Sequence, residues 1–344
     1  MTRPVRLLWL QSGGCGGCTL SLLGAQGPDL VSALELAGVE IVWHPSMSAA
    51  SGCEARARIE AVASGEEPLD IFCLEGSVMT GPDGTGLFHR MAGTDEAMMR
   101  VIERVAVRAD YVLAVGSCAA FGGITAAGGN EVGAVGLAYD GRQAGGLLGP
   151  EFRSGKGLPV INIAGCPIHP DWFTQTVQQI AAGVFDERDI DEWQRPLAYT
   201  GHLVHHGCAR NEFYEFKASA ENLCDMGCMM EHLGCKGTQA RADCNIRAWN
   251  GSGSCLDGNY PCINCTAPGF EEPGHEFTQT PKISGIPVGL PTDMPKAWFV
   301  ALASLSKAAT PARLKDNAAR DRMVTLPRDK ARDAAAAKPG KGKR

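Results

Sequence analysis

Short apolar runs that end in glycine-rich segments recur through the first half of the chain. Five of them have the length of a strand, at residues 5–10, 39–43, 69–74, 111–115 and 158–163. Uninterrupted apolar runs of this length are typical of strands buried on both faces of a parallel sheet. Residues 30–37, 96–107 and 171–182 have helical spacing. Strands that alternate with helices predict a doubly wound α/β domain.

Cysteines follow three of these runs at the point where each ends. The first run leads into Cys15-Gly16-Gly17-Cys18, the fourth into Cys118 and the fifth into Cys166. Because the carboxyl ends of parallel strands share one edge, we expect the four thiols to converge there. Four thiolates suit a [4Fe–4S] cluster. A CxxC pair alone would equally suit a redox pair or half a zinc site, and Cys118 and Cys166 could simply be small buried residues.

From about residue 199 to residue 270 the apolar periodicity disappears. The segment holds eight of the fourteen cysteines and many Gly and Asn residues. A segment without a hydrophobic pattern of its own must be held together by something else, and bound metal would serve. The candidate ligands are His205, Cys208, Cys228, Cys235, Cys244, Cys255, Cys262 and Cys265. They suffice for two more clusters, although tetrahedral zinc sites compete with this interpretation.

Charge and chain ends narrow the class of protein. The net charge is −6, while residues 310–344 carry 11 Lys and Arg against 4 Asp and Glu. An acidic body argues against nucleic acid as a partner, and the basic end predicts a poorly ordered tail. The first strand begins at once, with no leader or twin-arginine pair before it, and the apolar stretch at 297–306 is too short for a membrane anchor. We therefore expect a cytoplasmic protein whose cysteines bind metal.

In order and spacing, these motifs resemble the small subunit of nickel–iron hydrogenases. The resemblance reaches to about residue 270 and rests on WLQSGGCGGCT at 9–19, GSCAAFGG at 116–123, GCPIHP at 165–170, HHGCAR at 205–210 and PCINCTAPGF at 261–270. It implies a flavodoxin-like parallel-sheet domain at 1–195 and a largely irregular iron–sulfur cluster domain at 196–275. A C-terminal extension would occupy 276–344.

The resemblance also implies a ligand set for each of three clusters in line. Cys15, Cys18, Cys118 and Cys166 would hold a proximal [4Fe–4S] cluster, and His205, Cys208, Cys228 and Cys235 a distal [4Fe–4S] cluster. Cys244, Cys262 and Cys265 would hold the medial one, which is [3Fe–4S] in many family members that have proline in the fourth place. Here Cys255 occupies that place and predicts [4Fe–4S]. The spacing from Cys228 to Cys235 is one residue longer than usual, which leaves Cys224 as an alternative to Cys228.

Hydrogen chemistry would then belong to a partner large subunit that holds the nickel–iron centre. This chain would carry electrons and contribute no catalytic residue. The missing leader and anchor, with CGGC at the first pair, resemble the cytoplasmic regulatory branch, which senses hydrogen and signals to a histidine kinase. The alternatives are an energy-conserving uptake hydrogenase, a structural zinc-binding interaction protein, and a quinone-oxidoreductase cluster protein that shares only the proximal-type site.

Three further polar residues lie next to these motifs. Glu75, after the third strand, could support a cluster or a proton path, or simply accept backbone hydrogen bonds. His169 is expected to pack or to hydrogen-bond, since four thiolates already complete the proximal set. Arg210 could donate hydrogen bonds to a cluster or be a solvated charge.

Overall fold

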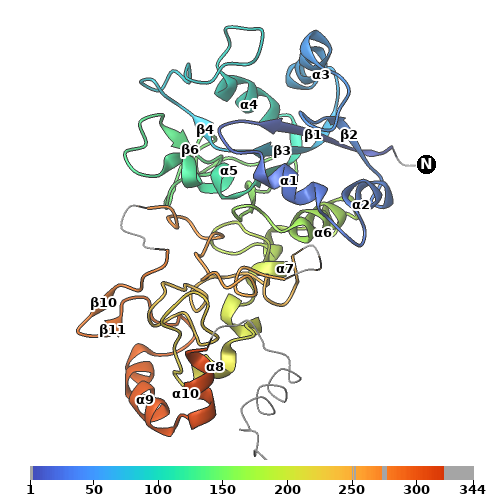
Figure 1. Cartoon of the computed structure of the whole chain (residues 1–344). Coiled ribbons are helices and arrows are strands. Elements are labelled where there is room, and N and C mark those ends of the chain that lie inside the picture. Colours follow the sequence, from blue (N-terminus) through green and yellow to red (C-terminus); the bar gives the residue numbers. More distant parts are fainter. Residues whose placement is uncertain (1–2, 250, 252, 273–276, 321–344) are drawn as a thin grey trace, which may run out of the picture.

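The computed structural model describes residues 3–249, 251, 253–272 and 277–320, with a sheet domain above a region of loops and short helices (Figure 1). Five parallel strands form the sheet in the order β2-β1-β3-β5-β9. They are β1 (Val5–Gln11), β2 (Val39–Trp43), β3 (Leu69–Glu75), β5 (Ala109–Val115) and β9 (Ile161–Ile163). This confirms the α/β class and four of the five strand predictions closely. The fifth strand is three residues long because Pro159 lacks the N–H that a ladder needs.

Alternate residues of the strands feed two apolar clusters on opposite faces of the sheet. Along β1, Leu7 and Trp9 belong to one cluster, and Leu8 and Leu10 to the other. The first face is covered by α1 (Gly17–Leu23), α2 (Leu30–Leu36) and α6 (Pro170–Ala181), and the second by α3 (Gly52–Ser64) and α4 (Met98–Ala106). The short helix α5 (Ser117–Phe121) packs on the end of β5. Uninterrupted apolar runs fit strands covered on both sides.

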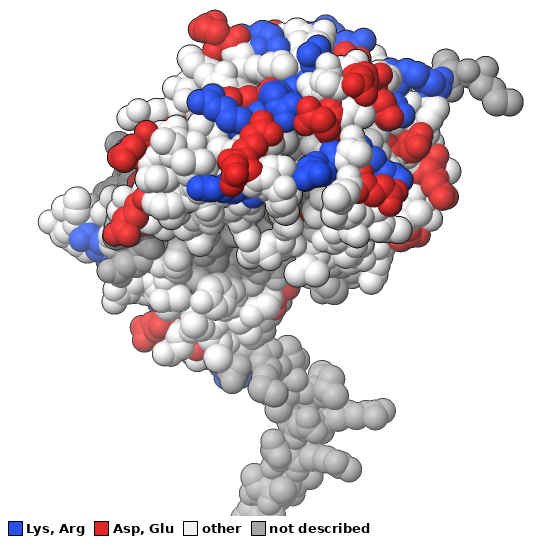
Figure 2. Space-filling model, turned by 90° about the horizontal axis from the view of Figure 1, so that it is seen from above, with Lys and Arg blue, Asp and Glu red and all other residues white. Residues whose placement is uncertain are grey.

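Short elements complete the sheet domain. Two antiparallel pairs are β4 (Val78–Met79) with β6 (Ala134–Val135) and β7 (Tyr139–Asp140) with β8 (Gln143–Ala144), and 3-10 turns lie at η1 (Gly123–Ala126) and η2 (Glu187–Asp189). Seen from the α3–α4 side, Figure 2 shows Lys and Arg interleaved with Asp and Glu. Arg104, for example, pairs with both Glu60 and Glu96. Because the two signs alternate, this face has no basic stripe of the kind that binds nucleic acid.

The second region contains little regular structure, as the lack of periodicity predicts. It begins with α7 (Leu197–Thr200), η3 (Val204–Gly207) and α8 (Asn211–Glu215). Between α8 and the hairpin of β10 (Lys282–Ile283) and β11 (Ile286–Pro287), the residues that the structure describes form no helix, only turns and isolated bridges. The domain boundaries at 195 and 275 stay a prediction.

The C-terminal extension is more ordered than the sequence indicates. Helix α9 (Lys296–Ala309) matches the apolar stretch, but α10 (Ala312–Ala318) lies inside the segment expected to be a disordered tail. Phe299 and Leu314 are buried against the second region, so apolar contacts hold both helices in place. The rest of the expected tail, 321–344, lies outside the described residues. Among those described, no helix is long and apolar enough to span a bilayer.

Candidate metal centres

The sheet brings the four proximal cysteines to one edge. Cys15 lies in the exposed loop after β1, Cys18 in the first turn of α1, Cys118 in the first turn of α5, and Cys166 in the loop after β9, three residues beyond its end. Two of these are therefore helical rather than in loops. Burial, and then the neighbouring thiolates of Cys265, Cys118 and Cys15, raise the pKa of Cys166 to about 12. Thiolates this close repel one another, so the group favours a bound cation that neutralises them.

Glycines leave space around the proximal sulfurs. A Cβ on Gly116 would lie 2.6 Å from Sγ of Cys18, and one on Gly123 would lie 3.0 Å from Sγ of Cys118. Both glycines also have positive φ, +90° and +56°, which side chains rarely adopt. The backbone N–H groups of Gly116 and Ser117 donate to the carbonyls of Ile163 and Gly165, at 2.8 and 3.0 Å. These bonds fix the Cys118 loop against the Cys166 loop.

Glu75 holds the start of α1. Its Oε1 accepts the backbone N–H groups of Cys18 and Thr19 at 3.0 and 3.1 Å, and its Oε2 accepts the Thr19 hydroxyl. The side chain is buried at the end of β3. Of the alternatives for Glu75, the structure therefore favours backbone hydrogen bonding, and this bonding positions Cys18.

The medial cysteines lie next to the proximal ones, since Cys265 is a neighbour of Cys166. Burial, followed by Cys255 and Asp243, raises the pKa of Cys244 to about 12. Burial also raises the pKa of Cys265 to about 12, and Cys244 and Cys255 add to this. Cys255 therefore lies beside Cys244 and Cys265, where the sequence predicts a fourth ligand. A cavity next to this group is lined by Cys166, Cys255, Cys265 and Trp249.

The distal residues line one small cavity. His205, Cys208, Cys228 and Cys235 face it together with Tyr214 and Met230, whereas Cys224 is exposed and lies outside its lining. The structure thus brings Cys228, and not Cys224, to this group. Nδ1 of His205 is buried and has no hydrogen-bond partner within the described ranges. A buried nitrogen without a partner is costly, and an iron atom in the cavity would take its lone pair.

The three groups lie in series. The hydroxyl of Ser117, next to Cys118, donates to the carbonyl of Cys265, which joins the proximal group to the medial one. At the other end, the N–H of Lys236, next to Cys235, donates to the carbonyl of Cys262 at 2.7 Å. One hydrogen bond therefore joins each pair of neighbouring groups, so the medial group lies between the proximal and the distal one.

Buried polar residues brace the loops that carry these cysteines. The Arg210 guanidinium donates to the carbonyls of Asp225 and Gly227, both at 2.7 Å, and the Arg210 backbone N–H donates to Sγ of Cys208 at 3.3 Å. Arg210 is therefore not a solvated charge. His169 accepts the N–H of Asp171 at the start of α6 and contacts the Trp249 ring, a packing role as expected.

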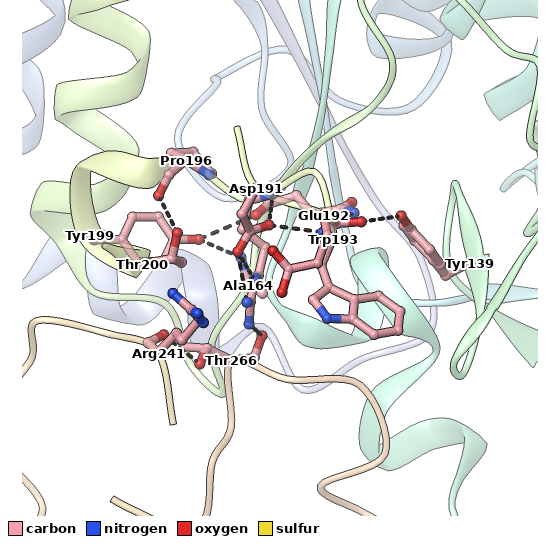
Figure 3. Close-up of polar contacts among 12 residues, drawn as sticks. Tyr139, Ala164, Asp191, Glu192, Trp193, Pro196, Tyr199, Thr200, Arg241 and Thr266 are labelled. Carbon is pink, nitrogen blue, oxygen red and sulfur yellow. Dashed lines mark hydrogen bonds and ion pairs between the residues drawn. The ribbon is translucent and has the colours of Figure 1, made fainter. Parts of the chain in front are cut away.

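A second brace ties the sheet to the medial group. Asp191 and Arg195 form a buried ion pair at 2.7 Å, and Arg195 donates to the carbonyl of Thr266 at 2.8 Å. The Thr266 hydroxyl in turn donates to the carbonyl of Arg241 at 3.0 Å. Figure 3 shows Asp191 and Thr266 in this network. Since Thr266 follows Cys265, the network fixes the backbone of a candidate ligand. Neither Asp191 nor Arg195 belongs to a motif that could have revealed this role.

Of the remaining cysteines, Cys73 is fully buried in β3 as a core residue, and burial raises its pKa well above the ordinary value. Cys53 is exposed at the start of α3. Neither lies in the three groups.

Comparison with known families assigns both halves of the chain. Residues 15–180 match the family of the NADH ubiquinone oxidoreductase 20 kDa subunit, and residues 200–278 match the family of the C-terminal part of NiFe/NiFeSe hydrogenase small subunits. The chain is 33% identical over 288 residues to the F420 non-reducing hydrogenase II small subunit of Methanosarcina mazei, covering 78% of this chain and 73% of the relative. It is 30% identical to the periplasmic [NiFeSe] hydrogenase small subunit of Desulfomicrobium baculatum, covering 77% and 84%.

Solved structures agree with this assignment. The actinobacterial-type NiFe-hydrogenase of Ralstonia eutropha H16 aligns with a TM-score of 0.73 and 27% identity, over 99% of this chain and 94% of that one. The [NiFeSe] hydrogenase of Desulfovibrio vulgaris Hildenborough aligns with a TM-score of 0.69 and 32% identity, over 81% and 98%.

An α/β sheet with cysteines at its edge, followed by a cysteine-rich irregular region, defines an iron–sulfur electron-transfer protein. The chain belongs to the small subunits of nickel–iron hydrogenases. Such subunits hold three iron–sulfur clusters and pair with a large subunit that holds the nickel–iron centre, so the chain is the electron-relay part of an oxidoreductase. This membership excludes the zinc-binding interaction protein. The match at 200–278 excludes a protein with a proximal-type site alone.

Proposed function

We propose that electrons cross this chain through three clusters held by twelve of its own side chains. Each set has four members: Cys15, Cys18, Cys118 and Cys166 for the proximal cluster; Cys244, Cys255, Cys262 and Cys265 for the medial cluster; and His205, Cys208, Cys228 and Cys235 for the distal cluster. When bound, the clusters supply one-electron oxidation and reduction. The chain supplies eleven thiolates and one imidazole as ligands.

One observation supports the proposal most strongly: the buried Nδ1 of His205, in a cavity that three cysteines share. Pulsed electron paramagnetic resonance (EPR) on the complex of both subunits tests it. We expect nitrogen hyperfine coupling on one reduced cluster, and we expect this coupling to vanish in His205→Cys. Coupling that persists in His205→Cys would assign the ligand elsewhere. His202→Gln, which alters an exposed histidine three residues away, is the matched control.

The medial cluster is proposed to be [4Fe–4S]. Cys255→Pro, which restores the residue that the family often has there, should convert it to [3Fe–4S] and give a new EPR signal in the oxidised protein. Cys224→Ser, at an exposed cysteine outside the cavities, should leave the spectrum unchanged. A [3Fe–4S] signal from the unaltered protein would refute Cys255 as a ligand.

The face around Cys15 is proposed to receive the large subunit. Cys15 is exposed, and two apolar residues near the proximal group are also exposed, Leu20 at 68% and Ile124 at 50%. Exposed apolar residues beside a redox site are typical of a protein interface. Leu20→Glu and Ile124→Glu should each reduce copurification with the large subunit. Leu36→Glu, at a 79% exposed residue of α2, should not.

The proposal extends to the role of the complex: it senses hydrogen in the cytoplasm and signals to a histidine kinase. This role is supported by the Cys15-Gly16-Gly17-Cys18 pattern, which resembles the regulatory branch. The uptake alternative is favoured by the relatives, which are named as F420 non-reducing and periplasmic hydrogenases. Slow hydrogen turnover with specific kinase capture would support sensing, and fast turnover without capture would support uptake. Cell fractionation tests the location.

A further inference from the structure

One carboxylate from the C-terminal extension joins two histidine rings beside the distal group. Nε2 of His205 lies 3.1 Å, and Nε2 of His206 2.9 Å, from the same Oδ2 of Asp293. The ring centroids are 4.7 Å apart with the planes tilted by 53°, so both rings can direct an N–H at that oxygen. The His205 side chain is 13% exposed and that of Asp293 is 35% exposed. The carboxylate therefore sits at the outer edge of the distal group.

The carboxylate decides which nitrogen of His205 carries the proton. An ionised carboxylate only accepts hydrogen bonds, so it favours the tautomer with the proton on the facing nitrogen. For His205 this is Nε2, which leaves the lone pair on Nδ1. Nδ1 is the atom that is buried without a hydrogen-bond partner in the described part of the chain, in the cavity of Cys208 and Cys228. Asp293, at the exposed edge of the ring, therefore favours the tautomer whose buried Nδ1 can bind iron.

The segment that carries Asp293 is anchored on both sides. The N–H of Thr292 donates to the carbonyl of Thr238 at 3.2 Å. Leu290 and Met294 pack against the apolar cluster of Tyr214, Met230 and Phe299, and the same cluster contacts Cys228 and Cys235. The extension thus fixes the carboxylate relative to the distal cysteines.

We propose that Asp293 is a positioning residue for the distal cluster, which holds His205 in the orientation and tautomer that bind iron through Nδ1 and lowers the reduction potential of the cluster. The inference rests on the proposed function, since it requires His205 as a ligand. A carboxylate bonded to a metal-bound histidine makes the ring a stronger electron donor and is itself needed for tight metal binding. Asp293 therefore acts on the last cluster before the electron leaves.

A surface cation is the rival occupant of these side chains. The ligand atoms of His205, His206 and Asp293 all lie within 4.8 Å of one another, close enough to hold a divalent ion. That ion would need Nε2 of His205 without its proton and would leave the buried Nδ1 unexplained. The positioning role accounts for both nitrogens of His205.

Asp293→Asn in the complete heterodimer tests the proposal, because asparagine keeps the shape and removes the charge. We expect an EPR-monitored redox titration to place the distal cluster at a more positive potential, with the other two clusters unmoved. Chelators should also extract distal iron more readily, with an apparent affinity lower by about 10–100-fold. Glu212→Gln, which neutralises another exposed carboxylate of the same region, is the control and should not shift the potential.

A double variant shows whether Asp293 changes the potential through the His205 ring or through its negative charge alone. In His205→Cys the fourth ligand is a thiolate, so adding Asp293→Asn should shift the potential by less than half as much as it does in the wild type. An equal shift in both backgrounds would overturn the positioning role. Stoichiometric zinc in the wild type that Asp293→Asn removes would also overturn it, in favour of a cation site.

The outcomes also distinguish an error in the ligand assignment from an error in the role of Asp293. A wild-type distal cluster without nitrogen coupling contradicts the ligand assignment of the proposed function. Nitrogen coupling together with an unchanged potential in Asp293→Asn contradicts only the role of Asp293.

Discussion

The two halves of the chain hold their cysteines by different means. In the sheet domain, strands such as β1 bury Leu7, Leu8 and Leu10 almost completely, and the cysteines lie at the ends of a scaffold that apolar packing stabilises. In the second region, the described residues between α8 and β10 form no helix, and Cys235, Cys244 and Cys262 are themselves part of the apolar packing. The proximal site is therefore built by the fold. At the medial and distal sites, bound metal must help to fold the loops that surround it.

Metal removal should separate the halves most clearly. A heterodimer prepared without iron, or stripped by chelator, should lose structure in residues 200–272 and keep the sheet, because metal binding there is coupled to folding. Hydrogen exchange measured by mass spectrometry checks this. Exchange in 200–272 should approach that of an unfolded chain, while β1, β3 and β5 stay protected. Equal protection of both halves without metal would show that the second region does not depend on metal for its structure.

A single methyl group should abolish the proximal site. Gly116→Ala places a Cβ 2.6 Å from Sγ of Cys18 at a φ of +90°, so the loop cannot keep its shape. We expect loss of one cluster, about a third of the iron, with the sheet still folded by circular dichroism. Gly38→Ala is the matched control, since it has a φ of +67° but nothing within 4 Å of its Cβ. This variant should lower the free energy of unfolding by only about 1–2 kcal/mol and retain all the iron.

Breaking the buried brace should weaken the junction between the halves. Arg195→Met leaves Asp191 as a buried charge without its partner and removes the bond to Thr266. The expected loss is about 3–5 kcal/mol. The rate at which cluster absorbance disappears on heating should rise accordingly. Arg313→Met, in an exposed pair with Glu212, should change it little. Similar rates for the two variants would show that the brace is unimportant.

Mild acid should weaken the sheet domain through His44. Burial lowers its pKa to about 4 from an ordinary value of 6.5, so the unfolded chain binds the proton more readily. The contribution of neutral His44 to the free energy of unfolding is fully present above pH 6.5 and is lost as the pH falls toward 4. Roughly 2 kcal/mol of this free energy is lost by pH 5. Denaturation followed by tryptophan fluorescence checks this, since His44 contacts the ring of Trp9. His44→Gln should flatten the dependence between pH 6.5 and 5, whereas His202→Gln should preserve it.

The same contrast explains what the sequence could predict. The strands, and the meeting of three cysteine-bearing loops at one edge of the sheet, follow from apolar runs such as 69–74, because buried parallel strands have few other patterns. The order of the strands in the sheet needed the structure. Helices α1, α3 and α5 were not predicted, because α1 and α5 are short and directly follow glycine, and α3 has only Ile59 and Val62 as large apolar residues to mark a helical period. The grouping of Cys228 rather than Cys224 needed the fold. Asp293 could not be inferred, because 88 residues separate it from His205 and a lone aspartate in a proline-rich loop carries no pattern.

The central claim is that three iron–sulfur clusters lie in series across the chain. Iron, sulfide and zinc analysis of the small subunit, purified with its partner and combined with EPR on reduction, tests it most directly. We predict about twelve iron and twelve sulfide ions in the small subunit, little zinc, and interacting signals from three [4Fe–4S] clusters, one with nitrogen coupling. Zinc in place of iron, or a single cluster with the second region still folded, would contradict the account.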